Sequence, residues 1–360
     1  MRINRSIPGQ LREDEQVAIA LVASLVPKDG KIVEVGSLLG RSSWIWSRNA
    51  DPSVTVYCID PWTGGGNFKK LADEADQTFS RQQFQANVAD CPNIVALQGY
   101  SPRDFLDWTA PIDLYFEDAV HTDPILAENL EFWGGKLVPT GILCGHDYID
   151  RFPDVKRGAE TAARKLNRRL RVINSFWFAL PPELEAAQDQ HTRDVLKQLH
   201  ELETYQCSLP GVNAGEPFVQ YCKRVVSGIG SFDYALRFFE IPTAVKQGDP
   251  IVLRGTLENT SGVNWPAMAC GDAFLKLGAE LRVGPERRKI ANDRYWLNVP
   301  VLSSGATTAF EIILPTAKAV VGLAEVYVDM VYDQVLWFEQ KGAKSHRLGV
   351  EIEARESSGH

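Results

Sequence analysis

Hydrophobic and polar residues follow two different patterns along this chain, and the change falls near residue 228. Before it, short apolar runs alternate with stretches whose apolar residues recur every three or four positions, as on one face of a helix. The runs predict strands at 32–35, 54–59, 94–97, 112–116 and 142–144. The periodic stretches predict helices at 11–26, 42–50, 78–89 and 130–136, the first of them amphipathic. This alternation predicts an α/β fold with a doubly wound, largely parallel sheet.

The pattern after residue 228 is typical of an all-β domain. Helical periodicity fades, and short β-rich runs are separated by Asn, Gly, Ser and Pro. The runs predict strands at 251–257, 273–277, 309–314, 324–332 and 334–338. Strands at such spacing predict an antiparallel sandwich of about seven strands. We therefore expect two domains, 1–228 and 229–360.

Composition narrows the classes of protein. The 360 residues are 44% hydrophobic and 23% charged, enough for two domains with their own cores. A net charge of −8 argues against a broad basic face for nucleic acid. No apolar run reaches about 18 residues and the N-terminus lacks a signal-peptide core, so we expect a cytoplasmic protein without a membrane span. The six cysteines are scattered without a Cys-x-x-Cys pair, which favours reduced thiols over zinc or disulfides.

Two glycines, Gly36 and Gly40, follow the first predicted strand and precede a helix that begins near Ser42. At such a junction backbone N–H groups point outward, and glycine has no Cβ to keep a ligand away. The Gly-x-x-x-Gly spacing is neither the dinucleotide-binding pattern nor a P-loop. Glu34, inside the strand, would repel a pyrophosphate but suits an ammonium group or ribose hydroxyls. This combination favours S-adenosylmethionine, a nucleoside without phosphate, although a purely structural turn stays open.

Polar residues also follow the next two strands. Asp60 lies at the end of the second strand, where an acidic residue about twenty positions past the glycine turn binds ribose hydroxyls in doubly wound folds. Its alternative role is to cap a turn, because Asp before Pro favours turns. Ser101 follows the third strand, where an adenine contact is expected. The glycine-rich segment 64–70 is either a lid over the ligand or an ordinary surface loop.

Carboxylates and histidines gather after the fourth and fifth strands, whose carboxyl ends meet at one edge of the sheet. Three of them, Asp118, His146 and Asp147, suit one Mg²⁺ or Mn²⁺ ion, which would hold vicinal hydroxyls and lower the pKa of the one attacked. His121 is placed to act as a general base. We therefore name His121, Asp118 and His146 as candidate catalytic residues. The alternative is that the carboxylates only hydrogen-bond a ligand or loop amides, with no metal.

Four motifs together resemble those of the class I S-adenosylmethionine-dependent methyltransferases, in particular bacterial O-methyltransferases that act on sugars and sugar-bearing natural products. The motifs lie at 34–42, 59–62, 112–121 and 141–148, and the resemblance covers about residues 11–180. It implies a Rossmann-like fold and, in metal-dependent members, Mg²⁺ at the positions of Asp118, His146 and Asp147. It also implies a set of cofactor-binding residues, namely Glu34, Gly36, Ser37, Gly40, Ser42, Asp60, Trp62, Ser101 and Asp118.

The chain departs from these relatives at one position. They contain Asp-Gly-Asp-His where this chain contains Asp-Ala-Val-His, so Val120 replaces an aspartate that is a candidate base in some members. The base role would then move to His121. The relatives also end their sheet with two antiparallel strands, which we place at 171–179 and 218–223 around a helical insertion at 183–206. The insertion is a substrate wall, a dimer contact or, as we favour, an amphipathic helix packed on the domain.

The second domain resembles an immunoglobulin-like module appended to bacterial enzymes that modify polysaccharides and glycans. The segments 257–266 and 329–338 carry this resemblance. Four aromatic residues could stack on sugar rings, although packing in the core is the commoner role: Trp265, Tyr295, Trp296 and Trp337. No acid, base or nucleophile constellation occurs in this part of the sequence. We expect the module to recognise, position or oligomerise.

The predicted function is methyl transfer from S-adenosylmethionine to an oxygen atom of a sugar, glycan or other small-molecule acceptor. Mg²⁺ is a second cofactor only in the metal-dependent alternative. Two other functions stay open. One is a non-catalytic glycan-assembly scaffold built on a degenerate methyltransferase domain, which Val120 favours. The other is metal-independent transfer to a small phenolic or amine acceptor. Nucleic acid is not an expected partner, and a homo-oligomer stays open.

Overall fold

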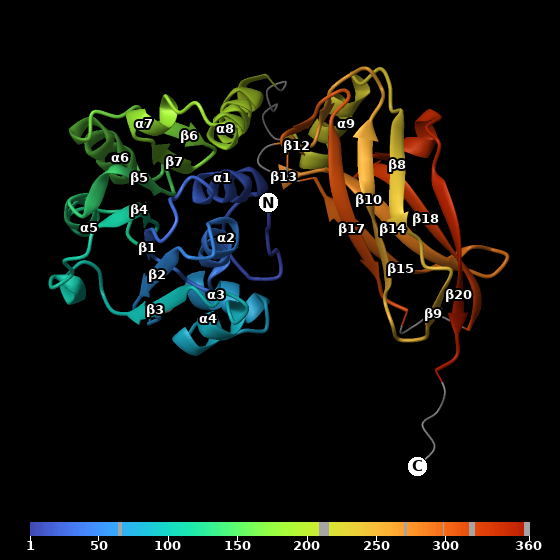
Figure 1. Ribbon diagram of the computed structural model, residues 1–360, viewed down its shortest axis with the longest axis horizontal. Helices are drawn as coiled ribbons and strands as arrows, with labels where there is room; N and C mark the ends of the chain where they lie inside the picture. The colour runs from blue at the N-terminus through green and yellow to red at the C-terminus, as the bar shows by residue number, and fades with distance from the viewer. Residues whose placement is uncertain (64–66, 209–215, 270–271, 298, 317–320, 356–360) are drawn as a thin grey trace, which may run out of the picture. The chain divides into compact units, whose positions relative to one another are not determined.

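A computed structural model describes residues 1–63, 67–208, 216–269, 272–297, 299–316 and 321–355. The chain forms two compact units, Met1–Cys207 and Ser208–His360 (Figure 1). Of the glycine-rich segment 64–70, predicted to be a lid or a surface loop, residues 64–66 lie outside the described residues and residues 67–70 begin a helix, Asn67–Glu74. Within the part of the chain that the structure describes, no helix combines the length and apolarity that crossing a membrane requires.

The first unit is built on a seven-stranded sheet of order β3-β2-β1-β4-β5-β7-β6. Its first five strands are parallel, and β7 runs antiparallel to both β5 and β6. This confirms the predicted doubly wound fold. The chain reverses its direction of winding between β1 and β4, which is where such sheets open a crevice for ligands. The strands are β1 Lys31–Val35, β2 Thr55–Asp60, β3 Ile94–Gln98, β4 Ile112–Glu117, β5 Leu137–Gly145, β6 Arg171–Ile173 and β7 Phe176–Ala179.

Helices cover both faces of this sheet, and the alternation of side chains along β1 decides what each residue meets. Val33 and Val35 pack in a core with Trp133 of α5. Glu34, between them, faces the opposite side, where Ser43 of α2 donates a hydrogen bond to it. The helices are α1 Glu13–Ala23, α2 Arg41–Asn49, α3 Asn67–Glu74, α4 Arg81–Asn87, α5 Ile125–Gly134, α6 Pro153–Lys165, α7 Pro182–Glu185 and α8 Gln190–Ser208, with a 3₁₀ turn η1 Arg103–Phe105.

The first helix is not amphipathic, contrary to the prediction. All residues of α1 are buried, including its acidic first turn, Glu13 to Glu15. The acidic residues are tolerated inside because they are paired: Arg5 lies 2.7 Å from Glu13, and the backbone N–H of Ser175 donates to Glu15 at 2.9 Å. The acidic first turn of α1 therefore lies against the rest of the first unit rather than in solvent.

The predicted strand at 218–223 is also wrong. These residues begin helix α9, Phe218–Ser227, which buries Tyr221, Cys222, Val225 and Val226 in the core of the second unit. The seventh strand lies instead at 176–179, because the chain turns back after β6 at Asn174, whose φ is +57°. The division between the units therefore falls at residue 207 rather than 228, one helix earlier than expected.

The insertion at 183–206 consists of the short α7 and the long α8. Val195, Leu199 and Leu202 are buried along one face of α8. Arg171 of β6 lies 2.6 Å from Glu203 of the same helix, an ion pair that ties it to the sheet edge. These contacts favour the ordinary packed helix over the other two roles.

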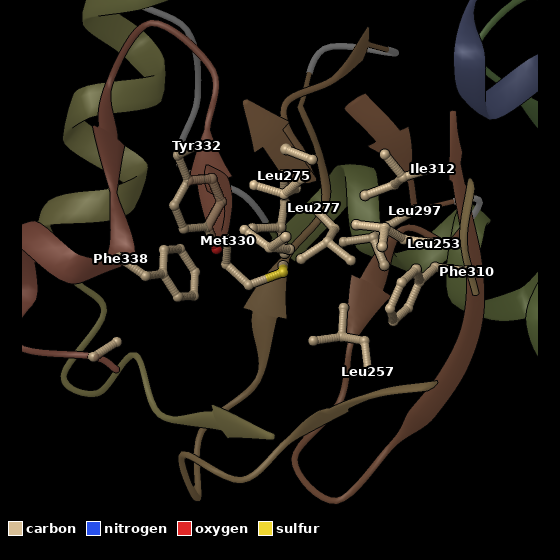
Figure 2. Close-up of a cluster of buried hydrophobic side chains, with 14 of the residues drawn as sticks. Leu253, Leu257, Leu275, Leu277, Leu297, Phe310, Ile312, Met330, Tyr332 and Phe338 are labelled. Atoms are coloured by element: carbon tan, nitrogen blue, oxygen red, sulfur yellow. The ribbon is translucent and has the colours of Figure 1, made fainter. Parts of the chain in front are cut away.

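Among its described residues, the second unit consists of strands apart from α9 and a 3₁₀ turn. It contains a three-stranded sheet of order β17-β10-β8 and a six-stranded sheet that runs β15-β14-β18-β20-β9, with β19 beside β18. Leucines of β10 and β14, Phe310 and Met330 meet in one core (Figure 2). The elements are β8 Tyr234–Glu240, β9 Ala244–Lys246, β10 Ile251–Asn259, β11 Trp265–Pro266, β12 Met268–Ala269, β13 Asp272–Ala273, β14 Leu275–Val283, β15 Arg288–Trp296, β16 Val301–Leu302, β17 Thr307–Leu314, β18 Gly322–Tyr332, β19 Leu336–Trp337, β20 His346–Glu353 and η2 Phe338–Lys341.

The four aromatic residues proposed to stack on sugars divide into two groups. Trp265 is fully buried, with its Nε1 donating to the Ser231 carbonyl at 2.9 Å, and Tyr295 packs against the core. Trp296 and Trp337 instead lie beside cations: the Lys276 ammonium is 3.6 Å from one ring centroid and the Arg294 guanidinium 4.7 Å from the other. Sugar binding stays a prediction for this second pair alone.

The cysteines that the structure describes behave as expected. Cys58, Cys91, Cys144 and Cys222 are buried, and none of them forms a disulfide. The side chain of Cys207 and the whole of Cys270 lie outside the described residues. Burial raises the pKa of Cys58 and Cys144 well above the ordinary value, which disfavours the reactive thiolate.

Candidate active site

A cavity of about 460 Å³ opens at the carboxyl ends of β1, β2, β4 and β5. It lies at the reversal of the sheet, where ligands of doubly wound folds bind. Of the predicted site residues, nine line it: Gly36, Ser37, Ser42, Asp60, Ser101, Asp118, His121, His146 and Asp147. Three others, Glu34, Gly40 and Trp62, are not part of its wall. The N-terminal segment Pro8 to Leu11, which the sequence did not indicate, also lines it.

Gly36 is a point of close approach between two strand ends. Its φ is +95°, and a Cβ at this position would overlap the carbonyl oxygen of Asp118. Its N–H donates to Ile59 at 2.9 Å, and the N–H of Asp118 donates to Val35 at 2.8 Å. The turn after β1 therefore packs directly on the turn after β4, which brings the glycine turn and Asp118 to the same wall.

Gly40 has a different role from the one expected. It is the N-cap of α2 with φ +95°, and a Cβ would lie 2.8 Å from Val88 and 3.1 Å from the Phe84 ring. Its lack of a side chain therefore permits the turn and the packing of α4, not the approach of a ligand. Trp62 lies on the same layer, with its ring 4.9 Å from Phe84 and its Nε1 donating to the Leu38 carbonyl at 2.9 Å.

Glu34 lies behind the glycine turn rather than in the cavity. Its side chain is fully buried on the α2 face of the sheet, where Ser43 donates to it. Burial raises the pKa of Glu34 to about 6, and hydrogen bonds from the surrounding serines only partly oppose this rise. We therefore assign Glu34 to fastening α2 onto β1, and the predicted contact with the cofactor is not supported. The alternation of side chains along β1, with Val35 on the other face, is the cause.

Asp60 combines the two roles considered for it. One carboxylate oxygen accepts from the N–H of Leu38 at 3.0 Å and the other from the N–H of Trp62 at 2.6 Å, so it caps both neighbouring turns. It also lines the cavity, and burial raises its pKa. Each carboxylate oxygen accepts more than one hydrogen bond, so both remain able to receive a ribose hydroxyl.

Ser101 lines the cavity as expected, but its hydroxyl is already committed. It accepts from Trp133 Nε1 at 2.8 Å and donates to Asn129 Oδ1 at 2.8 Å. The side chain therefore fixes the local wall. Beside it, the Tyr100 hydroxyl lies 2.9 Å from Thr63 Oγ1 and joins the ends of β3 and β2 across the cavity mouth.

The four polar residues after β4 and β5 converge as predicted. His121 Nε2 lies 2.7 Å from Asp147 Oδ2. His146 Nδ1 lies 3.5 Å from Asp118 Oδ1 and 3.6 Å from Asp147 Oδ2. Asp147 has φ +61°, a left-handed conformation that aims its carboxylate between the two imidazoles. The His121 ring also stacks on Phe152 at 4.2 Å, which sets the plane of the imidazole.

The charges of neighbouring groups and burial together shift the pKa values of the residues in this cluster. Hydrogen bonding to Asp147 raises the pKa of His121, against the effect of burial. Burial opposes the charge on His146, yet Asp118, Asp147 and Glu15 together raise its pKa well above the ordinary value. For Asp118 burial dominates and raises the pKa, whereas for Asp147 the two histidines outweigh burial and lower it. Asp147 is therefore the carboxylate best held in its ionised form.

Two members of this network were not found from the sequence. Glu15 of α1 places Oε2 at 3.2 Å from His146 Nε2, and the Ser175 hydroxyl lies 3.0 Å from the same nitrogen. Burial opposes ionisation of Glu15, but hydrogen bonds from His146 and Ser175 hold its pKa below the ordinary value. The only signal in the sequence was an acidic first turn, which the helix dipole explains equally well.

The donors fit a divalent cation. Asp118, His121 and Asp147 each offer a ligand atom within 4.8 Å of the others. Two carboxylates and one imidazole suit Mg²⁺ or Mn²⁺. The set contains His121 where the prediction had His146, whose Nε2 is engaged by Glu15 but whose Nδ1 still faces both carboxylates. His121 cannot serve as base while it is bound to a metal, so the two roles exclude each other.

Residues 33–148 match the model of a family described as a methyltransferase domain. A comparison with curated proteins finds no match.

Similar solved structures include an O-methyltransferase from Bacillus cereus in complex with SAH (16% identity, 49% of this chain and 84% of that chain covered, TM-score 0.37). A methyltransferase from Geobacter sulfurreducens is also similar (17%, 49% and 80%, TM-score 0.36). A third is the precorrin-6y C5,15-methyltransferase from Geobacter metallireducens (10%, 50% and 94%, TM-score 0.34). At these identities the likeness concerns the fold alone.

Proposed function

We propose that this protein methylates a hydroxyl oxygen of a sugar or glycan. The premise is that residues 33–148 are a class I methyltransferase domain dependent on S-adenosylmethionine. The observation that carries the proposal is the pairing of His121 with Asp147, 2.7 Å apart, in the wall of the cavity that also contains Asp60. A base–carboxylate pair beside a nucleoside-binding edge is what transfer of a methyl group to a hydroxyl requires.

The cofactor would lie along the ends of β1 and β2. Gly36, Ser37 and Ser42 line the part next to the glycine turn, and Asp60 lines the part where ribose hydroxyls are expected. Asp118 closes the same wall and suits the ammonium group of the methionyl end. The activated sulfonium belongs to the cofactor, so the protein's task is to align the acceptor oxygen with the methyl group and remove one proton.

His121 is the residue proposed to take that proton. When its Nε2–H donates to Asp147, the neutral ring keeps its lone pair on Nδ1. Asp147 then stabilises the imidazolium that forms, as the carboxylate of a catalytic triad does. Phe152 holds the ring by stacking, which limits its rotation. The acceptor hydroxyl would lose its proton to Nδ1 as it takes the methyl group, which the bound cofactor would supply from its sulfonium, leaving a neutral thioether.

A sugar is a suitable methyl acceptor because this side of the cavity is rich in groups that accept hydrogen bonds. The carboxylates of Asp118 and Asp147 can each accept hydroxyl hydrogens. In the metal-dependent alternative, Asp118 and Asp147 would hold Mg²⁺ with one of the two histidines. The ion would supply charge stabilisation of the attacked hydroxyl. Of the two histidines, His146 would then bind the ion through Nδ1, because this choice leaves His121 free to act as the base.

Two competing functions make different predictions. A non-catalytic scaffold is favoured by Val120, which replaces an acidic residue of the resembling enzymes. The short His121–Asp147 pair argues against it, because a scaffold does not need a half-buried base–carboxylate arrangement. Metal-independent transfer to a phenol or an amine would use His121 as the base, with no metal ion bound to Asp118. Only the choice of acceptor separates this function from the proposal.

The test begins with calorimetry of S-adenosylhomocysteine binding to the full chain, where wild type is expected to bind in the micromolar range and Asp60→Ala at least about tenfold more weakly. Labelled S-adenosylmethionine is then offered with a panel of sugar nucleotides, glycan fragments, phenols and amines, with Mg²⁺ or with a chelator. Glu160→Gln, which changes an exposed carboxylate that does not line the cavity, is the matched control. Absence of cofactor binding would refute the enzyme, and labelling of phenols or amines alone would refute the sugar acceptor.

A further inference from the structure

Two arginines line the cavity, and they differ in their partners. Arg103, at the end near Tyr100, is paired with Asp104 at 2.9 Å and is exposed. Arg41, at the end near the glycine turn, has no carboxylate within 4 Å among the residues that the structure describes. It is the half-buried arginine of the two. A cation that is half removed from water and lacks a counter-ion is costly unless a ligand supplies the charge.

The surroundings of Arg41 fix the guanidinium. Its Nε donates to the Ile7 carbonyl at 2.7 Å and its Nη1 to the Leu11 carbonyl at 3.5 Å. A Cβ on Gly9 would lie 2.9 Å from the Arg41 side chain, so the side chain lies flat on that glycine. Glu13, the acidic residue whose charge acts on Arg41, is itself paired with Arg5 at 2.7 Å. Arg41 is therefore held in place by backbone oxygens, and none of the described contacts involves its Nη2.

The local backbone adds to the positive character of this end of the cavity. Arg41 is the first residue of α2, and no side chain caps that helix. Its first N–H groups and the positive end of its dipole favour an anion. Asp118, in the same wall, favours a cation. The two residues together complement a zwitterion rather than a simple anion.

We propose that Arg41 binds a carboxylate in this cavity. The proposal rests on the proposed function, because its first source of the carboxylate is the amino-acid end of S-adenosylmethionine, whose ammonium would face Asp118. The second source is an acidic acceptor such as a uronic acid. A planar guanidinium held by two carbonyls presents its remaining N–H groups in a fixed direction, which suits two-point binding of a carboxylate. The same contacts would couple ligand binding to the N-terminal segment 7–11.

The test compares binding of S-adenosylhomocysteine with binding of its decarboxylated form, which keeps the nucleoside, the thioether and the amine. Wild type is expected to prefer the carboxylate form by about tenfold or more, as for a hydrogen-bonded charge pair. Arg41→Met is expected to lose that preference, and Arg41→Lys to keep part of it. Arg103→Met is the matched control and is expected to keep the wild-type ratio. Because each ratio is taken within one variant, partial unfolding lowers both affinities and leaves the ratio unchanged.

A second arm identifies the source of the carboxylate. Methyl transfer is measured with glucuronate and with glucose, an acidic and a neutral sugar with the same ring. If Arg41→Met keeps the cofactor ratio but loses a wild-type preference for glucuronate, the acceptor supplies the carboxylate and the proposal stands. If wild type shows neither preference, or Arg41→Met keeps both, the proposal is overturned while the proposed function survives. Wild type that binds neither form of the cofactor refutes the proposed function, and the inference falls with it.

Discussion

Oε2 of Glu15 lies 3.2 Å from Nε2 of His146, so a residue of the first helix reaches the end of the fifth strand. Both side chains are almost completely buried, and Ser175 hydrogen-bonds to both of them. The pair fixes which nitrogen of His146 faces the cavity, because Nε2 is occupied and Nδ1 is left toward Asp118 and Asp147. The N-terminal helix is therefore part of the support of the candidate active site.

Glu15→Gln is expected to destabilise the first unit. Removing one partner of a buried ion pair costs about 3–5 kcal/mol when the other charge is left uncompensated. The cost here is expected at the lower end of that range, because Asp118 and Asp147 still face His146 at 3.5 and 3.6 Å. Glu201→Gln is the matched control, because Glu201 is exposed on α8 beside Lys197 at 3.8 Å and such pairs contribute at most about 1 kcal/mol. Urea unfolding followed by circular dichroism measures both. Equal stability of the two variants would show that Glu15 and His146 are not a charged pair.

His121→Ala is expected to lower turnover by a factor of about 10²–10⁴, the usual contribution of a general base, while binding of S-adenosylhomocysteine stays within about twofold of wild type. His191→Ala, which removes a surface histidine of α8, serves as control. Single-turnover rates at saturating cofactor give the comparison. Full turnover by His121→Ala would remove this residue as the base and leave Asp118 or Asp147 to be tested next.

Glu34 makes the stability of the first unit depend on pH in an uncommon direction. Burial raises its folded-state pKa from 4.5 to about 6, so the folded protein holds a proton that the unfolded chain has released. The stability that the folded protein has while Glu34 is protonated is fully present below pH 4.5 and is lost as the pH rises through 6. The difference amounts to about 2 kcal/mol at 1.36 kcal/mol for each pKa unit.

Glu34→Gln tests this directly. The free energy of unfolding of the variant relative to wild type is expected to improve by about 2 kcal/mol between pH 4.5 and pH 7.5, because glutamine does not ionise. Comparison at each pH cancels the titration of other groups. A difference that does not change with pH, or that changes in the opposite sense, would mean that Glu34 ionises in the folded protein as easily as in water.

The sequence predicts the first unit well because its signals are local. Apolar runs, glycine turns and polar strand ends each occupy a few consecutive residues, and the rule that ligands bind beyond the carboxyl ends of parallel strands assembles them. His121 and Asp147 could therefore be placed in one crevice before the fold was known. The side chain of Glu34 was assigned to the cavity, although alternation along the strand places it on the opposite face of the sheet from Val33 and Val35.

Other features depend on contacts between distant parts of the chain. Glu15 has the appearance of a helix-start residue, and only the packing of α1 against the sheet shows that it meets His146. The segment at 218–223 is apolar enough for a strand, but Val225 and Val226 extend its periodicity into a helix that packs in the second unit. In the same way, the placement of Pro8 to Leu11 along the cavity depends on Arg41, which hydrogen-bonds to Ile7 and Leu11 from thirty or more positions away.

Gly36→Ala is expected to destabilise the first unit and to abolish cofactor binding, because the new Cβ would collide with the backbone of Asp118 and the φ of +95° is unfavourable for alanine. The two effects together cost about 2–5 kcal/mol. Gly134→Ala is the matched control: nothing lies within 4 Å of a Cβ there, and the change within α5 is expected to be neutral or to stabilise by up to about 1 kcal/mol. Urea unfolding and calorimetry with S-adenosylhomocysteine follow both variants. If Gly36→Ala folds and binds like Gly134→Ala, the strand ends of β1 and β4 are not in direct contact, and the shared wall on which the candidate site depends does not exist.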